Sequence, residues 1–187
     1  MAAILAKLSL LQRIAENFTW EEFSRACAEE KQNLGVINVK EVKFRNVKID
    51  FYSQQLIPAD ELTEFVPLET LRDGSCFFRS ISKQIYGDES LHEELRLIAI
   101  VELALNESYY LSDEELCDRI RAQEWTFRGN GADSMDPVVL MTVFREEVKA
   151  TRNLSTYASF WHLQAIANVL KRKIKSVYPE TTPEVGS

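Results

Sequence analysis

Cys76 lies in the stretch LRDGSCFFRS, residues 71–80, where the pattern of apolar residues predicts the start of a helix. Free N–H groups and the positive end of the helix dipole favour the thiolate form of a cysteine at that place. The same N–H groups could hold the oxyanion that forms when a thiolate attacks a carbonyl. Gly74 would let a substrate backbone approach, and Asp73 could accept N–H bonds in the turn. The stretch therefore predicts a nucleophilic cysteine.

The alternative for each cysteine is burial as a small apolar residue, which is common for free cysteine. Burial in the core is the expectation for Cys27 and Cys117, whereas the neighbours of Cys76 favour the nucleophile. Three widely spaced cysteines without a CxxC pair form neither a disulfide framework nor a zinc-binding pattern, and they favour a reducing compartment. We expect no metal ion and no cofactor.

The residues from Asp73 to Ser80, DGSCFFRS, match all six fixed positions of the signature Asp-Gly-x-Cys-x-Phe-Arg-[Ala/Ser]. This signature belongs to the ovarian-tumour (OTU) family of cysteine proteases, which remove ubiquitin from proteins. The chain resembles that family over residues 64–179, where the later segment WHLQAIANVLKRKIKSVYP is similar to a helix-to-strand unit of the family. Together with ELRLIAIVELALNESYYL, this segment makes the chain most similar to the vertnin-like, transposon-associated branch.

The resemblance implies an OTU-like, papain-type cysteine protease fold of the α/β (α+β) class, with a small central sheet flanked by helices. Cys76 would be the catalytic nucleophile, and Asp73 would support its loop or the catalytic constellation. Backbone N–H groups of the loop formed by Asp73, Gly74, Ser75 and Cys76 would form the oxyanion hole, and Arg79 would support the helix. The implied reaction is hydrolysis of an isopeptide bond, and the implied partner is ubiquitin or a ubiquitinated protein.

The histidine that such a protease needs is missing from its usual place. A histidine must take the thiol proton and later protonate the leaving amine. The family carries it after the helix-to-strand unit, but this sequence contains only two histidines, His92 and His162, and both lie earlier. We expect His92 to have a surface or capping role in the first turn of a helix, and His162 to be partly buried and hydrogen-bonded. No catalytic histidine is identified, so we expect weak or absent activity.

Helices and two strands are predicted around the cysteine loop. Helical spacing predicts two helices before Gly35, and the second begins with a capping box formed by Thr19 and Glu22. The alternation of apolar and charged residues over 42–51 then predicts a strand. Gly87 is placed to end the helix that begins at Cys76. A last helix is predicted over about 157–172, followed by a strand over 173–179.

Three parts of the chain are expected. They are an N-terminal helical and strand extension over residues 1–63, an OTU-like domain over 64–179, and a polar tail over 180–187. The domain is expected to be truncated and to lack the last strands of the family, because a half-finished sheet would leave an unpaired edge.

The composition of the 187 residues restricts the possible functions. A net charge of −7 and a pI near 5.0 make nucleic acid an unlikely partner, since a nucleic-acid surface needs clustered Lys and Arg. No apolar run approaches the roughly 20 residues that cross a bilayer, so we expect no membrane association and an intracellular protein of the cytoplasm or nucleus. Two alternatives to a deubiquitinase stay open. One is a non-catalytic OTU-like protein-binding module, and the other is a vertnin-like nuclear or transposon-derived protein.

Overall fold

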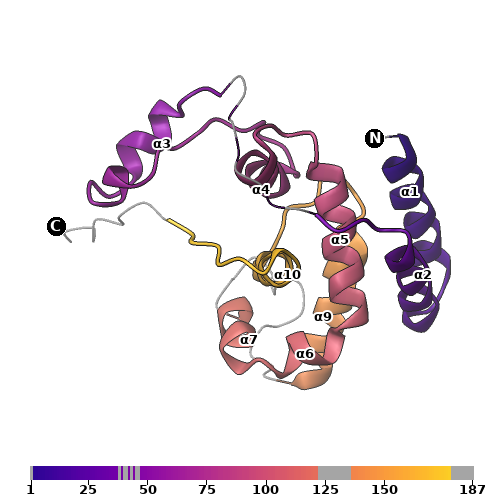
Figure 1. Cartoon of the computed structure of the whole chain (residues 1–187). Helices are drawn as coiled ribbons and strands as arrows, with labels where there is room; N and C mark the ends of the chain where they lie inside the picture. Colours follow the sequence, from indigo (N-terminus) through magenta and orange to yellow (C-terminus); the bar gives the residue numbers. More distant parts are fainter. Residues whose placement is uncertain are drawn as a thin grey trace.

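The computed structural model describes residues 2–37, 39, 42, 44, 47–121 and 136–177. In these ranges the chain is helical, with short turns between most elements (Figure 1). The helices in chain order are α1 (Ala2–Asn17), α2 (Trp20–Gln32), α3 (Phe51–Leu56), the 3-10 helix η1 (Glu61–Thr63), α4 (Cys76–Tyr86), α5 (His92–Leu105), α6 (Glu107–Ser112), α7 (Glu114–Arg121), α9 (Pro137–Ala150) and α10 (Phe160–Leu170).

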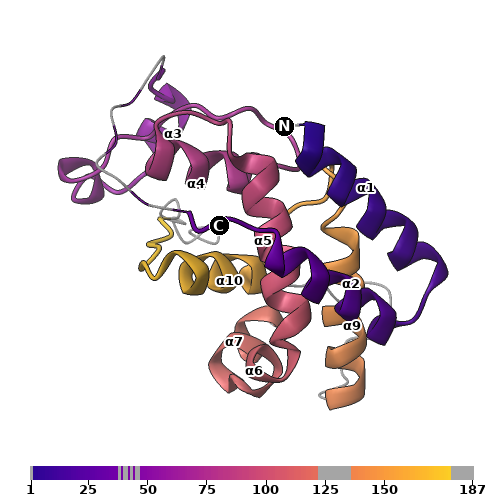
Figure 2. The same cartoon turned by 45° about the vertical axis from the view of Figure 1, so that its right-hand side comes forward.

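Helix α5 is the centre of the molecule. Its residues from Leu95 to Val101 are all buried, and all of them except Arg96 are apolar, as expected for a helix in the middle of a core. Helices α1 and α2 cover one side of α5, while α4, α9 and α10 pack around the rest of it (Figures 1 and 2). Phe23 from α2 and Phe144 from α9 join α5 in one continuous core, so the two N-terminal helices share their packing with the later part of the chain.

The helix that carries Cys76 is held by a second group of buried residues. Phe78 and Ile81 of α4 pack against Leu95 of α5 and Ile166 of α10. The Phe78 side chain is fully buried, two positions after the cysteine. This packing fixes the first turn of α4 against the central helix and therefore fixes the start of the cysteine loop.

The predicted helix boundaries follow from local signals that the structure retains. Thr19 caps α2, and the reciprocal bonds between Thr19 and Glu22 form the predicted capping box. Gly87 ends α4 with a φ angle of 95°, a left-handed conformation that glycine adopts without steric cost. The last helix is shorter than predicted, since α10 ends at Leu170.

The prediction of an α/β fold with a small central sheet is wrong for the described residues, which contain helices and no strand. The one trace of pairing in these ranges is an isolated antiparallel bridge between Ile49 and Leu68. The predicted strand over 42–51 does not continue, because the Asp50 side chain accepts the N–H groups of Tyr52 and Ser53 and starts α3. A carboxylate that caps a helix ends the extended backbone that a strand requires.

The predicted strand over 173–179 is also wrong where it can be followed. Residues 172–177 have no regular secondary structure, and no described segment forms a hydrogen-bond ladder with them. An extended segment becomes a strand only when a neighbouring strand pairs with its backbone groups. Residues 178–179 and the predicted polar tail over 180–187 lie outside the described residues. No helix in the described part is long and apolar enough to cross a membrane.

Candidate functional site around Cys76

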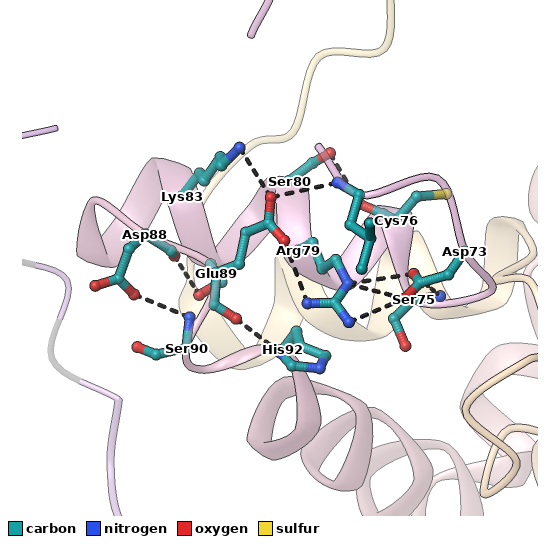
Figure 3. Close-up of polar contacts among 12 residues, drawn as sticks. Asp73, Ser75, Cys76, Arg79, Ser80, Lys83, Asp88, Glu89, Ser90 and His92 are labelled. Atoms are coloured by element: carbon teal, nitrogen blue, oxygen red, sulfur yellow. Dashed lines mark hydrogen bonds and ion pairs between the residues drawn. The ribbon is translucent and has the colours of Figure 1, made fainter. Parts of the chain in front are cut away.

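Cys76 is the first residue of α4, and its side chain is partly exposed. Figure 3 shows the sulfur pointing away from Glu89 and His92 at the start of the helix. The backbone before it turns tightly, since the N–H of Cys76 donates to the carbonyl oxygen of Asp73 at 3.0 Å. The cysteine therefore lies where the sequence predicted, on a loop at a helix N-terminus.

Asp73 and Arg79 form a two-pronged ion pair beside the cysteine. The Nε and Nη2 atoms of Arg79 donate to the carboxylate of Asp73 at 2.9 to 3.2 Å (Figure 3). The hydrogen bonds from Arg79, with a smaller contribution from the Ser75 N–H, hold the pKa of the Asp73 carboxyl below its usual value. Asp73 is therefore an anion that closes the loop, and Arg79 supports it from within α4.

Glu89 extends this pair towards the other end of α4. Its carboxylate accepts from the Nη1 atom of Arg79 at 3.2 Å and pairs with the Nζ atom of Lys83 at 2.8 Å (Figure 3). No sequence pattern pointed to Glu89, because it lies in the turn after Gly87 and only the fold brings it back to Arg79. The two carboxylates thus hold Arg79 from both sides.

Arg96 of α5 is a second residue that the sequence analysis did not select. Its side chain is completely buried, and its guanidinium lies over the ring of Phe78 at 4.7 Å. The Nη2 atom donates to the carbonyl oxygen of Gly74 at 2.7 Å and to the hydroxyl of Ser75 at 3.1 Å. Other bonds from the two Nη atoms end on carbonyl oxygens of a later segment, those of Thr151, Asn153, Leu154 and Thr156. The one feature of the sequence that could have pointed to Arg96 is its position as a charged residue within the apolar stripe of α5.

The segment 151–156 forms a wall of the cysteine loop. A Cβ atom on Gly74 would overlap the backbone of Ser155, so glycine is required here by the close approach of two loops. The hydroxyl of Ser75 also donates to the carbonyl oxygen of Leu154 at 3.2 Å. The space beside Gly74 that we had expected to admit a substrate backbone is thus occupied by the protein itself.

The backbone N–H groups of the loop are largely engaged. The N–H of Ser75 donates to the Asp73 carboxylate at 2.8 Å, and that of Cys76 donates to the Asp73 carbonyl. Within the described part, the N–H groups of Gly74, Phe77 and Phe78 make no hydrogen bond. An oxyanion hole that uses Ser75 or Cys76 would need those groups to exchange partners or to share their hydrogens.

His162 is a structural residue of the interior. It is 1% exposed, and its Nδ1 atom accepts the backbone N–H of Ser159 at 3.0 Å. The Nε2 atom therefore carries the ring hydrogen and donates to the Thr151 hydroxyl. Burial, assisted by the charge of Arg96, lowers the pKa of His162 to about 3. The imidazole is neutral and both of its nitrogens already have partners.

His92 begins α5 and is 8% exposed. Its Nδ1 atom lies 2.7 Å from the carbonyl oxygen of Glu89. In Figure 3, His92 and the sulfur of Cys76 lie on opposite sides of the Arg79–Asp73 pair. No hydrogen bond joins Cys76 to either histidine among the described residues.

A buried carboxyl lies behind the same segment. Glu147 of α9 has a carboxyl oxygen, Oε2, that is buried without a hydrogen-bond partner in the described structure. Burial raises the pKa of Glu147 to about 7, and a hydrogen bond from Ser159 opposes that shift only in part. Glu147 therefore takes up a proton far more readily than an exposed glutamate does.

The other two cysteines lie in the core, as expected. Cys27 is fully buried between helices, and burial raises the pKa of its thiol to about 12. Cys117 is 2% exposed, and its Sγ atom donates to the carbonyl oxygens of Tyr110 and Leu111. Cys76 is thus the accessible thiol of the three. The described ranges contain no group of three or more His, Cys, Asp or Glu residues placed to hold a metal ion.

Cys76 lies on a closed loop at a helix start, within a signature of the OTU class. Comparison with known proteins places the chain in that class. A family model described as "Vertnin, OTU domain" matches residues 67–187. The chain belongs to this family of vertnin OTU domains.

The individual relatives are vertnins from several vertebrates. Human vertnin is 31% identical over 137 residues, which cover 71% of this chain and 20% of that protein. Vertnin of Danio rerio is 29% identical over 186 residues, which cover 95% of this chain and 27% of that protein. The chain thus spans about a fifth to a quarter of the length of the curated relatives it matches. No solved structure matches it.

Proposed function

We propose that this chain is an OTU-type module whose Cys76 is a thiol nucleophile towards ubiquitin isopeptide bonds, and that its turnover is weak or absent. The observation that carries the proposal is the partly exposed Cys76 at the start of α4, on a loop closed by Asp73, Arg79 and Arg96. The family membership supports the OTU-type module.

We expect weak turnover because the reaction needs proton transfers that neither histidine is placed to assist. In the reaction the thiolate of Cys76 attacks the isopeptide carbonyl, and the leaving lysine amine needs a proton. His162 is held by Ser159 and Thr151 in the interior, and His92 is directed to the Glu89 carbonyl. General acid–base help from a positioned histidine is worth about 10²–10⁴-fold, and this arrangement supplies none of it.

The loop itself adds a second reason for slow turnover. The N–H groups of Ser75 and Cys76 donate to Asp73, so a developing oxyanion would have to compete with that residue. Loss of one oxyanion donor costs about 10²–10³-fold in other enzymes. Nucleophilic attack on an activated electrophile is less sensitive to both deficits than turnover of an amide.

The test compares labelling with cleavage. The chain is incubated with ubiquitin that carries a C-terminal vinyl electrophile, and with ubiquitin dimers, beside Cys76→Ala and Cys117→Ala variants. We expect slow labelling that Cys76→Ala abolishes and Cys117→Ala preserves, together with little or no dimer cleavage. Rapid cleavage of dimers would contradict the conclusion that no histidine serves as a catalytic base for Cys76. Tight ubiquitin binding without labelling would replace the nucleophile with a non-catalytic binding module, and absence of both would overturn the proposal.

A further inference from the structure

Arg96 is a buried cation whose hydrogen bonds to the described residues end on neutral atoms. Its acceptors are backbone carbonyl oxygens and one serine hydroxyl, at 2.7 to 3.3 Å. The neighbouring arginine behaves differently, because Arg79 is paired with Asp73 and Glu89. Arg145 of α9 is likewise paired, with Glu107. Within the residues that the structure describes, no carboxylate is bonded to Arg96 to neutralise its charge.

Packing alone does not account for an arginine at this position. Burial lowers the pKa of Arg96 to about 10, which reflects the free energy needed to take its charge out of water. Its Nε atom is also buried without a hydrogen-bond partner in the described structure. Leu95 and Leu97, its neighbours in α5, are fully buried leucines. An apolar side chain would avoid this cost for the charge, but it would leave the carbonyl oxygens that accept from Arg96 without partners, so the role of the arginine is to join them.

The position of the guanidinium explains what the charge can do. It joins two segments that are distant in the sequence, the turn at Gly74 and Ser75 and the segment 151–156. Gly74 and Ser75 come immediately before Cys76, so their placement sets the start of α4. The ionisable groups whose charges act on Arg96 are Asp73 and Cys76 at the loop and Arg79 on α4. Arg79 is paired with two carboxylates, whereas no carboxylate is bonded to Arg96 in the described structure, so the charge of Arg96 is available to a thiolate at Cys76.

We propose that Arg96 is a positioning residue for Cys76, which holds the Gly74–Ser75 turn against residues 151–156 and stabilises the thiolate by its positive charge. The proposal rests on the proposed function only in taking Cys76 to be a nucleophile. It does not depend on ubiquitin, on a histidine or on turnover.

The test measures the reactivity of Cys76 towards iodoacetamide across pH 6 to 10, with the labelled residue identified by mass spectrometry. The thiolate sulfur attacks the methylene carbon, the C–S bond forms as the C–I bond breaks, and iodide leaves. We expect alkylation at pH 7 to be about fivefold slower in Arg96→Met, with the rate profile moved to higher pH, because a nearby positive charge has been removed. Arg145→Gln loses a partly buried ion pair elsewhere and serves as the matched control.

A second measurement decides the matter if Arg96→Met does not fold. Lysine in Arg96→Lys keeps the charge but lacks the planar fork that reaches both segments. We expect amide hydrogen exchange to rise together over residues 73–76 and 151–156 in this variant, while alkylation at pH 7 stays within about twofold of the wild type. Wild-type exchange in both segments for Arg96→Lys, or an alkylation profile in folded Arg96→Met equal to that of Arg145→Gln, would overturn the proposal. Absence of both ubiquitin labelling and ubiquitin binding would overturn the proposed function and would leave this inference standing.

Discussion

The carboxyl of Glu147 makes the stability of the fold depend on pH, and Glu147→Gln isolates that dependence. The pKa of this group is about 7 in the folded chain because of burial, against 4.5 for an unperturbed glutamate. The folded state therefore holds the proton more strongly than the unfolded state does. Stability is retained in full below pH 4.5, decreases as pH rises from 4.5 to about 7, and reaches its lower level above pH 7.

The size of the effect follows from the shift in pKa. One pKa unit corresponds to about 1.4 kcal/mol, so ionising Glu147 costs the folded state about 3 kcal/mol at pH 8. Glutamine has nearly the same shape and no charge. We expect Glu147→Gln to be more stable than the wild type by about 3 kcal/mol at pH 8 and nearly equal to it at pH 4.5. His162 does not confuse the comparison, since its pKa of about 3 keeps it neutral over this range.

Urea unfolding followed by tryptophan fluorescence measures this difference, because Trp20 and Trp161 are buried in the folded chain. At ordinary slopes for small proteins, the gain at pH 8 corresponds to a rise of about 1–3 M in the urea midpoint. Glu146→Gln is the matched control, as Glu146 is exposed on the same helix. An equal gain for Glu147→Gln at pH 5 and pH 8, or a loss at pH 8, would refute the reasoning.

Two further predictions concern packing. Gly74→Ala should destabilise the fold by about 1–3 kcal/mol because its Cβ meets the Ser155 backbone, whereas Gly35→Ala, with open space around it, should change the free energy of unfolding by less than about 1 kcal/mol. Phe144→Ala should cost about 3–5 kcal/mol, because the ring is fully buried and packs edge-on against Trp161 at 5.0 Å. Chemical unfolding at neutral pH measures all three, and equal values for the two glycine variants would argue against the clash.

Local signals predicted where helices start and end. The Thr19–Glu22 capping box and the left-handed glycine at Gly87 both depend on residues within one turn of each other, so the sequence alone contains their cause. The same is true of Cys76 at the start of α4. The sequence signature also led to the OTU class, which the family match confirms.

The strand predictions were wrong because a strand also depends on residues far away in the sequence. Alternation of apolar and charged residues over 42–51 satisfies a local rule, but a strand also needs a partner, and the Asp50 cap redirects the chain into α3. Arg96 and Glu89 were missed because their partners lie in other segments of the chain. A single sequence indicates that a residue is charged within an apolar stripe, but only the fold shows which carbonyl oxygens surround it.

The bonds of Arg96 to the segment 151–156 end on main-chain oxygens. Such bonds do not use the side chains of the segment, so substitutions at Arg152 or Leu154 would leave the support of the cysteine loop intact. Thr151 and Asn153 are exceptions, because their side chains bond to His162 and to the N–H of Ser155 and so hold the backbone in place. Insertion or deletion of one residue would move every acceptor out of register with the guanidinium. The length of this segment is therefore under tighter constraint than its amino-acid sequence. We expect related chains to differ in the residue types of this segment more than in its number of residues.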